Sequence, residues 1–133
     1  MKKFTKPLVL MGIIMSFTLT SCGITESSNS DGEKIINSYL GAYENPQGIQ
    51  WNDMENATCS GTELGATLSR KSAQDENGTI LKKGWRTKSI IKKETDQEDR
   101  VYIKYELMDG NKRGIEAVKA NDSWCIQDDE LIF

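Results

Sequence analysis

The chain has 133 residues, with 17 basic and 20 acidic side chains, three cysteines and no histidine. That length suits a single domain. The absence of histidine excludes a Ser-His-Asp triad, a Cys-His pair and a His-ligated zinc site. No pair of carboxylates has a recognisable spacing, so we expect a protein without catalytic residues, metal site or cofactor.

The N-terminal residues have the pattern of an export signal. Lys2, Lys3 and Lys6 precede an uncharged stretch of 13 residues, from Leu8 to Thr20. As a helix, this stretch would reach only ~20 Å, against ~30 Å for the hydrocarbon core of a bilayer. A basic region followed by a short apolar core is typical of a cleaved signal peptide, which we place at residues 1–21.

Residues 19–22 read Leu-Thr-Ser-Cys and resemble the lipobox of bacterial lipoproteins. The resemblance implies that Cys22 carries a lipid and becomes the acylated first residue of the mature chain. Several acyl chains anchor a protein stably, so we expect an extracytoplasmic domain held to a membrane of the cell envelope. Gly23 implies the outer membrane if the organism has two. The alternative is an ordinary signal peptide with a chance cysteine.

Removal of residues 1–21 would leave 14 basic and 20 acidic side chains, a net charge of −6. Such a surface disfavours nucleic acid as a partner. Residues 22–30 are polar and predict a flexible tether. Residues 31–133 then form one domain.

Helices are predicted first in this domain. Residues 30–33 have the spacing of a capping box, in which Ser30 starts a helix. Apolar side chains recur after it at steps of three and four, and Asn45-Pro46 ends the pattern. A second short helix is predicted around Trp51 and Met54. Another capping-box spacing at residues 60–63, with Ser60 as its first residue, predicts a third helix.

After Gly78 the apolar period changes from about 3.6 to 2, which predicts strands over residues 79–85, 86–93 and 101–108. A three-residue loop, Asp109 to Asn111, would pair Tyr105 with Ile115 and keep one face apolar. A tight turn at residues 121–122 would pair Ala117 with Ile126. The acidic run 128–130 is expected to end the last strand in solvent, before a short apolar tail at 131–133.

The order of elements predicts an α+β fold: an N-terminal helix and short helical pieces packed on a curved antiparallel sheet of about four strands. The lipobox, the first helix and the closing strand, whose residues 118–126 read Val-Lys-Ala-Asn-Asp-Ser-Trp-Cys-Ile, resemble small bacterial lipoproteins with a nuclear-transport-factor-like, cystatin-like domain. This resemblance covers residues 31–128. It implies a cone between helices and sheet, and commonly no assigned activity.

Cys59 and Cys125 remain once Cys22 is assigned to the lipid. An even number of cysteines in an exported chain suggests a disulfide, here closing a loop of about 65 residues. Two separate buried thiols are the alternative.

Basic side chains are concentrated in residues 79–93, which carry six positive charges and no acid. This segment could contact lipid headgroups, another anionic envelope component or an acidic envelope protein. Lysines that keep an edge strand soluble are the alternative. The candidate contact residues are Lys82, Lys83, Trp85, Arg86, Lys88, Lys92 and Lys93.

Three functions are compatible with these features. The first is a lipid-anchored, non-catalytic interaction domain whose basic strands bind an envelope component. The second is a module for a small apolar or anionic ligand inside the cone, with Trp51 and Trp124 as walls and with Tyr102 and Tyr105 also lining the mouth of the pocket. The third is an inhibitor, immunity or exclusion factor acting at the envelope. Core packing is the alternative role for the aromatic residues.

Overall fold

The computed structural model of the chain describes residues 20–130, with residues 20–30 described in backbone only. The predicted signal peptide therefore lies largely outside the described residues, as do the side chain of Cys22 and the tail 131–133. The elements in chain order are α1 (Thr20–Tyr43), α2 (Trp51–Ala57), α3 (Glu63–Gln74), the 3₁₀ turn η2 (Lys83–Trp85), β1 (Thr87–Gln97), β2 (Arg100–Leu107), β3 (Lys112–Ala120) and β4 (Ser123–Asp129).

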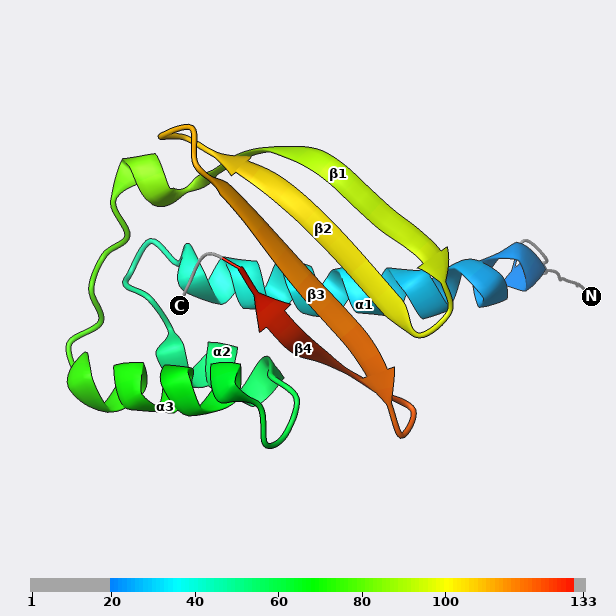
Figure 1. Ribbon diagram of the computed structural model, residues 1–133, viewed down its shortest axis with the longest axis horizontal. Helices are drawn as coiled ribbons and strands as arrows, with labels where there is room; N and C mark the ends of the chain where they lie inside the picture. The colour runs from blue at the N-terminus through cyan, green and yellow to red at the C-terminus, as the bar shows by residue number, and fades with distance from the viewer. Residues whose placement is uncertain (1–19, 131–133) are drawn as a thin grey trace, which may run out of the picture.

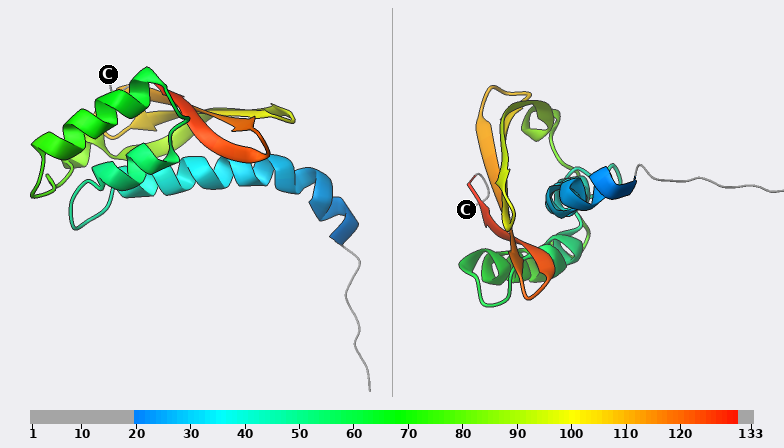
Figure 2. Two further views of the ribbon diagram at one scale, coloured as in Figure 1. Left: turned by 90° about the horizontal axis from the view of Figure 1, so that it is seen from below. Right: turned by 90° about the vertical axis from the view of Figure 1, so that its right-hand side faces the viewer.

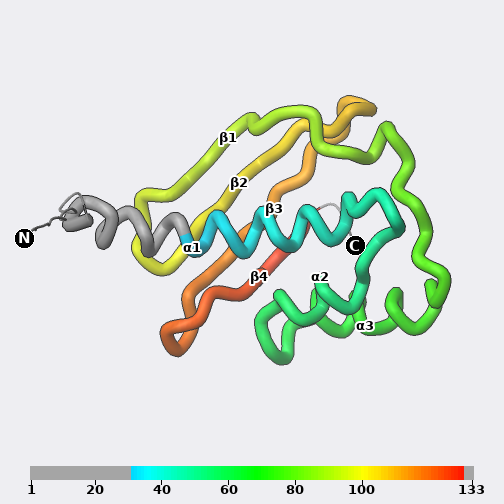
Figure 3. Tube along the Cα trace, turned by 180° about the vertical axis from the view of Figure 1, so that it is seen from behind, coloured from blue at the N-terminus to red at the C-terminus, as the bar shows by residue number. Residues whose placement is uncertain are grey.

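The four strands form one antiparallel sheet in the order β1-β2-β3-β4. Helix α1 lies across one face of the curved sheet, and α2 and α3 lie beside the β4 edge (Figure 1). The views from the side and from behind show α1 on the same face throughout (Figures 2 and 3). This architecture confirms the predicted α+β fold.

The core lies between α1 and the inner face of the sheet. Ile36, Tyr39 and Tyr43 recur at helical spacing along α1 and are buried. Strand β2 buries alternate residues, as its period of two predicts. Met54 from α2 and Leu68 from α3 extend the same core. Buried apolar side chains on both layers therefore hold the helices to the sheet.

Helix α1 begins before the predicted start at Ser30. Its backbone is helical from Thr20, and residues 22–30, predicted as a tether, belong to it. No proline or glycine lies between Ile24 and Ser30, so nothing in that stretch breaks a helix. The capping-box spacing at Ser30 therefore does not start the helix. Its end, at Tyr43, agrees with the predicted stop before Asn45-Pro46.

The start of α3 also differs from the prediction. Thr62, rather than Ser60, is the N-cap, and its Oγ1 accepts a hydrogen bond from the Gly65 amide at 3.1 Å. The intervening Gly61 has a positive φ of 74°, a conformation that glycine adopts readily and that turns the chain before the helix. The helix consequently begins at Glu63.

The predicted strand at residues 79–85 is wrong. Residues 79–82 are irregular and residues 83–85 form η2. The amide of Asp109, in the β2–β3 hairpin, donates to the Gly84 carbonyl at 2.8 Å. The hairpin therefore bonds to the backbone of the 3₁₀ turn η2, and no strand forms there. The strand predicted at 86–93 is present as β1 and continues to Gln97.

The two hairpins test the predicted register. In β2–β3, Tyr105 pairs with Arg113 and Ile103 pairs with Ile115, so the predicted pairing of Tyr105 with Ile115 is wrong by two residues. The loop has three residues, as predicted, but it begins one residue earlier, at Met108. The apolar faces still coincide because odd positions face odd positions. In β3–β4, Ala117 pairs with Ile126, as predicted. Asn121 and Asp122 both have positive φ in that turn, the conformation of a two-residue hairpin loop.

Candidate functional site

A pocket of about 630 Å³ opens at the end of the molecule where α1 terminates. In this region the connection after α3 passes the end of α1 to reach η2 and the β2–β3 hairpin (Figure 1). Three aromatic rings line the pocket, together with two aliphatic side chains of its floor. These residues are Tyr43, Trp51, Trp85, Ile49 and Leu107. The volume and the aromatic lining are typical of small-molecule sites.

Trp51 is fixed in the pocket wall by its polar edge. Its indole Nε1 donates to Asp75 Oδ2 at 2.7 Å, and its ring meets that of Tyr43 edge-on at a centroid distance of 6.2 Å. Asp75 also accepts from the Thr79 amide at 2.8 Å and from its hydroxyl at 2.9 Å. The hydrogen bonds from Thr79 and Trp51 hold the pKa of Asp75 below its usual value. The indole is therefore oriented before any ligand arrives.

A close backbone approach joins two loops beneath this wall. The Ile49 amide donates to the Thr79 carbonyl at 2.8 Å. A Cβ atom added to Gly48 would lie 2.6 Å from the carbonyl oxygen of Gly78, and Gly48 has a φ of +132°. Only glycine fits both conditions. Gly48 thus places the start of α2, with Trp51, against the segment that carries Thr79.

Trp85 forms the opposite wall from η2. The amides of Asp109 and Met108 donate to the carbonyls of Gly84 and Arg86, each at 2.8 Å, and tie η2 to the hairpin. Lys82 Nζ lies 4.9 Å from the centre of the Trp85 ring. Trp85 is 44% exposed and also lines the pocket, so the residue faces both the pocket and solvent.

A buried ionic cluster supports the pocket from the core. Arg113 donates to both carboxylate oxygens of Asp129, from Nε at 3.0 Å and from Nη2 at 2.6 Å. The Tyr39 hydroxyl donates to Asp129 Oδ2 at 2.8 Å. The guanidinium lies 4.3 Å from the ring centre of Tyr43, which also lines the pocket. The cluster therefore fixes the Tyr43 wall from behind.

Burial sets the protonation of this cluster. It lowers the pKa of Arg113, but the hydrogen bonds and the charge of Asp129 outweigh that effect and leave the pKa raised. Burial raises the pKa of Tyr39, with the nearby Asp129 charge as the next cause. It raises the pKa of Tyr105, the cross-strand neighbour of Arg113, to about 12. At neutral pH the guanidinium is therefore charged and the phenols are neutral.

Sequence reasoning missed this cluster. Asp129 was predicted to lie in a solvated turn, but it is buried in β4. A register shift between Glu116 and Ala117 disrupts the simple alternation between β3 and β4. The burial of Arg113 could have been predicted, because in the alternating pattern of β3 it lies on the same apolar face as Ile115 and Ala117.

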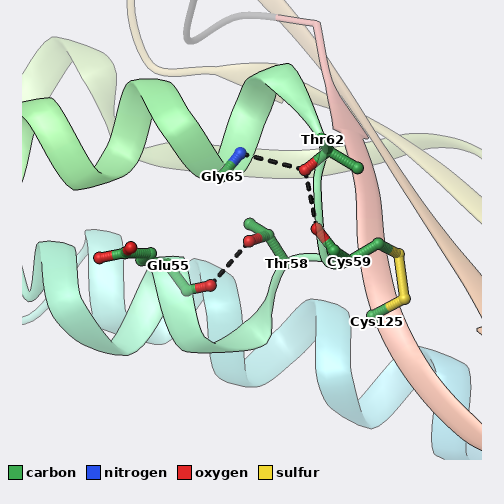
Figure 4. The surroundings of a disulfide bond; sticks show 6 residues. All are labelled: Glu55, Thr58, Cys59, Thr62, Gly65 and Cys125. Atoms are coloured by element: carbon green, nitrogen blue, oxygen red, sulfur yellow. Dashed lines mark hydrogen bonds between the residues drawn. A yellow bond between two sulfur atoms is a disulfide. The ribbon is translucent and has the colours of Figure 1, made fainter.

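The structure joins Cys59 and Cys125 in a disulfide, with a Cα–Cα distance of 4.9 Å. Figure 4 shows Cys59 between α2 and α3, bonded to Cys125 on β4. The Thr62 hydroxyl donates to the Cys59 carbonyl at 2.9 Å, and the Cys59 amide donates to Ile126 at 2.9 Å. The disulfide thus fastens the turn between the two short helices to the edge of the sheet.

The other aromatic residues proposed as cone walls lie elsewhere. Trp124 packs against the core beside Gly32 of α1. The Tyr102 hydroxyl donates to Glu130 at 3.0 Å outside the pocket, and Tyr105 is buried in the core. Of the pair Trp51 and Trp124, the structure therefore places only Trp51 at the pocket.

The seven residues of the predicted basic patch lie on η2 and β1 or next to them. Arg86 donates to the Glu44 carbonyl at 3.0 Å. Lys92 pairs with Glu94 at 3.0 Å, and Lys93 pairs with Glu33 of α1. Within residues 31–130, Lys82, Lys83 and Lys88 have no carboxylate within ion-pair distance. The patch is therefore divided into paired and unpaired cations.

Two further findings concern the described part of the chain. It contains no group of three or more Cys, Asp or Glu residues that could hold a metal ion. None of its helices has both the length and the hydropathy of a membrane span.

No protein-family model, no curated protein and no solved structure matches this chain.

Proposed function

We propose that this chain is a lipid-anchored lipoprotein of the bacterial cell envelope whose domain is a non-catalytic binding module for a small, largely apolar ligand. The observation that carries the proposal is the aromatic pocket between Trp51 and Trp85. Its walls are held by hydrogen bonds within the protein, so little ordering is needed when a ligand binds.

The anchor is supported by the sequence. The basic residues, the short apolar core and the Leu-Thr-Ser-Cys run that ends at Cys22 agree in spacing with a lipoprotein signal. An extracytoplasmic location also suits the bond between Cys59 and Cys125, because disulfides persist in oxidising compartments. A helix across one face of a curved antiparallel sheet, with shorter helices beside its edge, agrees with the proposed likeness to nuclear-transport-factor-like lipoproteins.

Binding is favoured over catalysis by the state of the polar groups around the pocket. Asp75 is occupied by donors from Trp51 and Thr79. Asp109 accepts from the amide and from the side chain of Asn111, each at 3.0 Å. Carboxylates used in this way position walls and loops. Lys71 and Gln74 also line the pocket, but most of its exposed surface is aromatic or aliphatic, which favours a largely apolar ligand.

The test is a titration with anilinonaphthalene sulfonate, a small aromatic probe of apolar sites. We expect saturable binding that the Trp51→Ala variant weakens by at least about tenfold, because that change removes one wall of the pocket. Trp124→Phe is the matched control and should bind like the parent. Equal affinities for Trp51→Ala and Trp124→Phe, with both variants folded by circular dichroism, would refute the pocket assignment.

The anchor is tested separately by the mass of the protein extracted from membranes. We expect the chain to begin at Cys22 and to carry two or three acyl chains. Cys22→Ala should leave an unacylated chain with an uncleaved N-terminus. An unmodified Cys22 in the parent protein would contradict the anchor without affecting the pocket.

A further inference from the structure

The large apolar side chains that are exposed within residues 31–130 share one region of the molecule. Each is 44–63% exposed, and they lie on the segment before η2, on η2, on β1 or at the tip of the β2–β3 hairpin. They are Ile80, Trp85, Ile90, Ile91 and Met108. Single exposed apolar residues are common on soluble proteins, but a cluster of them marks a contact surface.

This region also carries the unpaired cations described above, Lys82, Lys83 and Lys88. We call these three lysines and the five apolar residues the β1-side surface. Residues 79–93 contain no acidic side chain at all, although the chain as a whole has an excess of acid. Exposed apolar groups and unpaired positive charge are therefore combined on one side of an otherwise acidic protein.

The β1-side surface is built on well-fixed backbone. The hairpin tip is tied to η2 by the bonds that Met108 and Asp109 donate. Thr87 pairs with Leu107 at the start of β1, and Ile90 pairs with Tyr105 farther along. β1 forms the edge of the sheet opposite β4 (Figure 1). The surface consequently follows the β1 edge of the sheet from η2 along the strand.

Addition of a partner strand is a poor explanation for this surface. β1 departs from regular pairing at three places along its length, and such irregularities, together with lysines, disfavour edge-to-edge pairing. An acidic protein would explain the lysines but not the number of exposed isoleucines. Tryptophan, isoleucine and lysine together are typical of segments that lie at a membrane interface, where long lysine side chains keep their charge in water.

We propose that the β1-side surface rests on an anionic bilayer. The apolar side chains would enter the headgroup region, while Lys82, Lys83 and Lys88 neutralise lipid phosphates. This inference rests on the proposed function in one respect, because the lipid on Cys22 would hold the domain at the membrane. The two contacts would lie at opposite ends of one side of the molecule: η2 lies toward the end where α1 terminates, and Cys22 lies near the start of α1 (Figure 1). Glu33, about 16 Å along the helix from Cys22, forms an ion pair with Lys93, so β1 connects the two ends.

The experiment uses the intact lipoprotein in vesicles of phosphatidylcholine or phosphatidylglycerol with brominated acyl chains, which quench tryptophan at short range. The quenching lost in the Trp85→Phe variant reports contact of Trp85 with lipid. We expect this signal in phosphatidylglycerol and little of it in phosphatidylcholine. It should fall at about 0.5 M salt, where charges are screened beyond a few ångströms.

The charge variants give the sharper comparison. Lys82→Glu, Lys83→Glu and Lys88→Glu combined should lower the contact signal by roughly tenfold or more, since each basic residue near an anionic surface contributes about a fivefold effect. Lys34→Glu, Arg70→Glu and Lys119→Glu combined make the same change in charge away from the β1-side surface and should leave the signal within about twofold.

Equal signals in the two lipids, or equal losses in the two triple variants, would overturn the proposal. So would capture of an acidic envelope protein by a domain whose Trp85 never contacts lipid. Binding of the fluorescent probe by each variant without vesicles shows whether the pocket is intact. If the mass of the extracted protein shows no lipid on Cys22, the chain is added to preformed vesicles instead. The Trp85 quenching signals of the two triple variants are then compared in the same way.

Discussion

The two edge strands of the sheet, β4 and β1, differ in what covers them. The β4 edge is covered by α2 and α3, linked to them by the disulfide Cys59–Cys125, and backed by the buried pair Arg113–Asp129. The β1 edge has no helix of the described residues over it and carries lysines and exposed isoleucines. We therefore expect interactions at the β4 edge to contribute more to the free energy of unfolding than those at the exposed β1 edge.

The largest effect is expected from loss of the disulfide. Replacing Cys59 and Cys125 together by serine should lower the free energy of unfolding by about 4 kcal/mol, because the bond closes a loop of 66 residues in the unfolded chain. Urea unfolding with and without reductant measures this difference. An unchanged unfolding midpoint would contradict the account of the β4 edge.

Asp129→Asn should cost about 3 kcal/mol, because it leaves the buried charge of Arg113 without its ionic partner. Asp128→Asn is the matched control, since Asp128 is the exposed neighbour on the same strand, and should change stability by less than about 0.5 kcal/mol. Similar unfolding midpoints for the two variants would show that the buried pair does not stabilise this edge.

Two glycines of α1 test its contact with the sheet. A Cβ atom on Gly32 would lie 2.7 Å from Val101 and 2.9 Å from Trp124, whereas one on Gly41 meets nothing within 4 Å. Gly32→Ala should therefore destabilise the fold by about 1–3 kcal/mol. Gly41→Ala should stabilise it by about 0.5–1 kcal/mol, through helix propensity. Thermal unfolding of the two variants measures these changes in stability. If both variants were stabilised, or both destabilised, the close approach of Gly32 to Val101 and Trp124 would be contradicted.

Acid should loosen the pocket wall at Trp51. The pKa of Asp75 is lower in the folded protein than in the unfolded chain, so its contribution to stability is present above about pH 4, the ordinary range of aspartate, and is lost as the pH falls through the folded pKa. Tryptophan emission should shift in that range, and the shift should be absent in Asp75→Asn. A pH-independent spectrum in the parent protein would refute this coupling.

The smallest effect on stability is expected at the β1 edge. Lys82→Glu, Lys83→Glu and Lys88→Glu should each change the free energy of unfolding by less than about 0.5 kcal/mol, since the three lysines are exposed and form no ion pair among residues 31–130. Urea unfolding checks this. A loss of several kcal/mol would mean that this edge is structural, and the contrast between the edges would fail.

The sequence was informative where one local signal dominated. The stripe that includes Ile36 and Tyr39 predicted the buried face of α1, and the alternation in β2 predicted its inner face. The turn at residues 121–122 fixed the pairing of Ala117 with Ile126. In each case the periodicity of a single element, or a short turn, was sufficient.

The sequence was uninformative where distant segments determine the outcome. Residues 79–85 look like a strand, but the hairpin bond to Gly84 and the approach of Gly48 to Gly78 place them in a loop and a 3₁₀ turn. The polar surroundings of Trp51 depend on Asp75, 24 residues away. Asp129 was predicted to be exposed because its partner lies on another strand.

The most direct test of the proposed binding module is the nuclear magnetic resonance of its three indole N–H groups during titration with anilinonaphthalene sulfonate in the absence of vesicles. Signals are assigned with the Trp51→Phe, Trp85→Phe and Trp124→Phe variants. The proposal predicts that the Trp51 and Trp85 signals shift with saturation, while that of Trp124 stays in place. A titration that moves Trp124, or leaves all three signals unchanged, would contradict it.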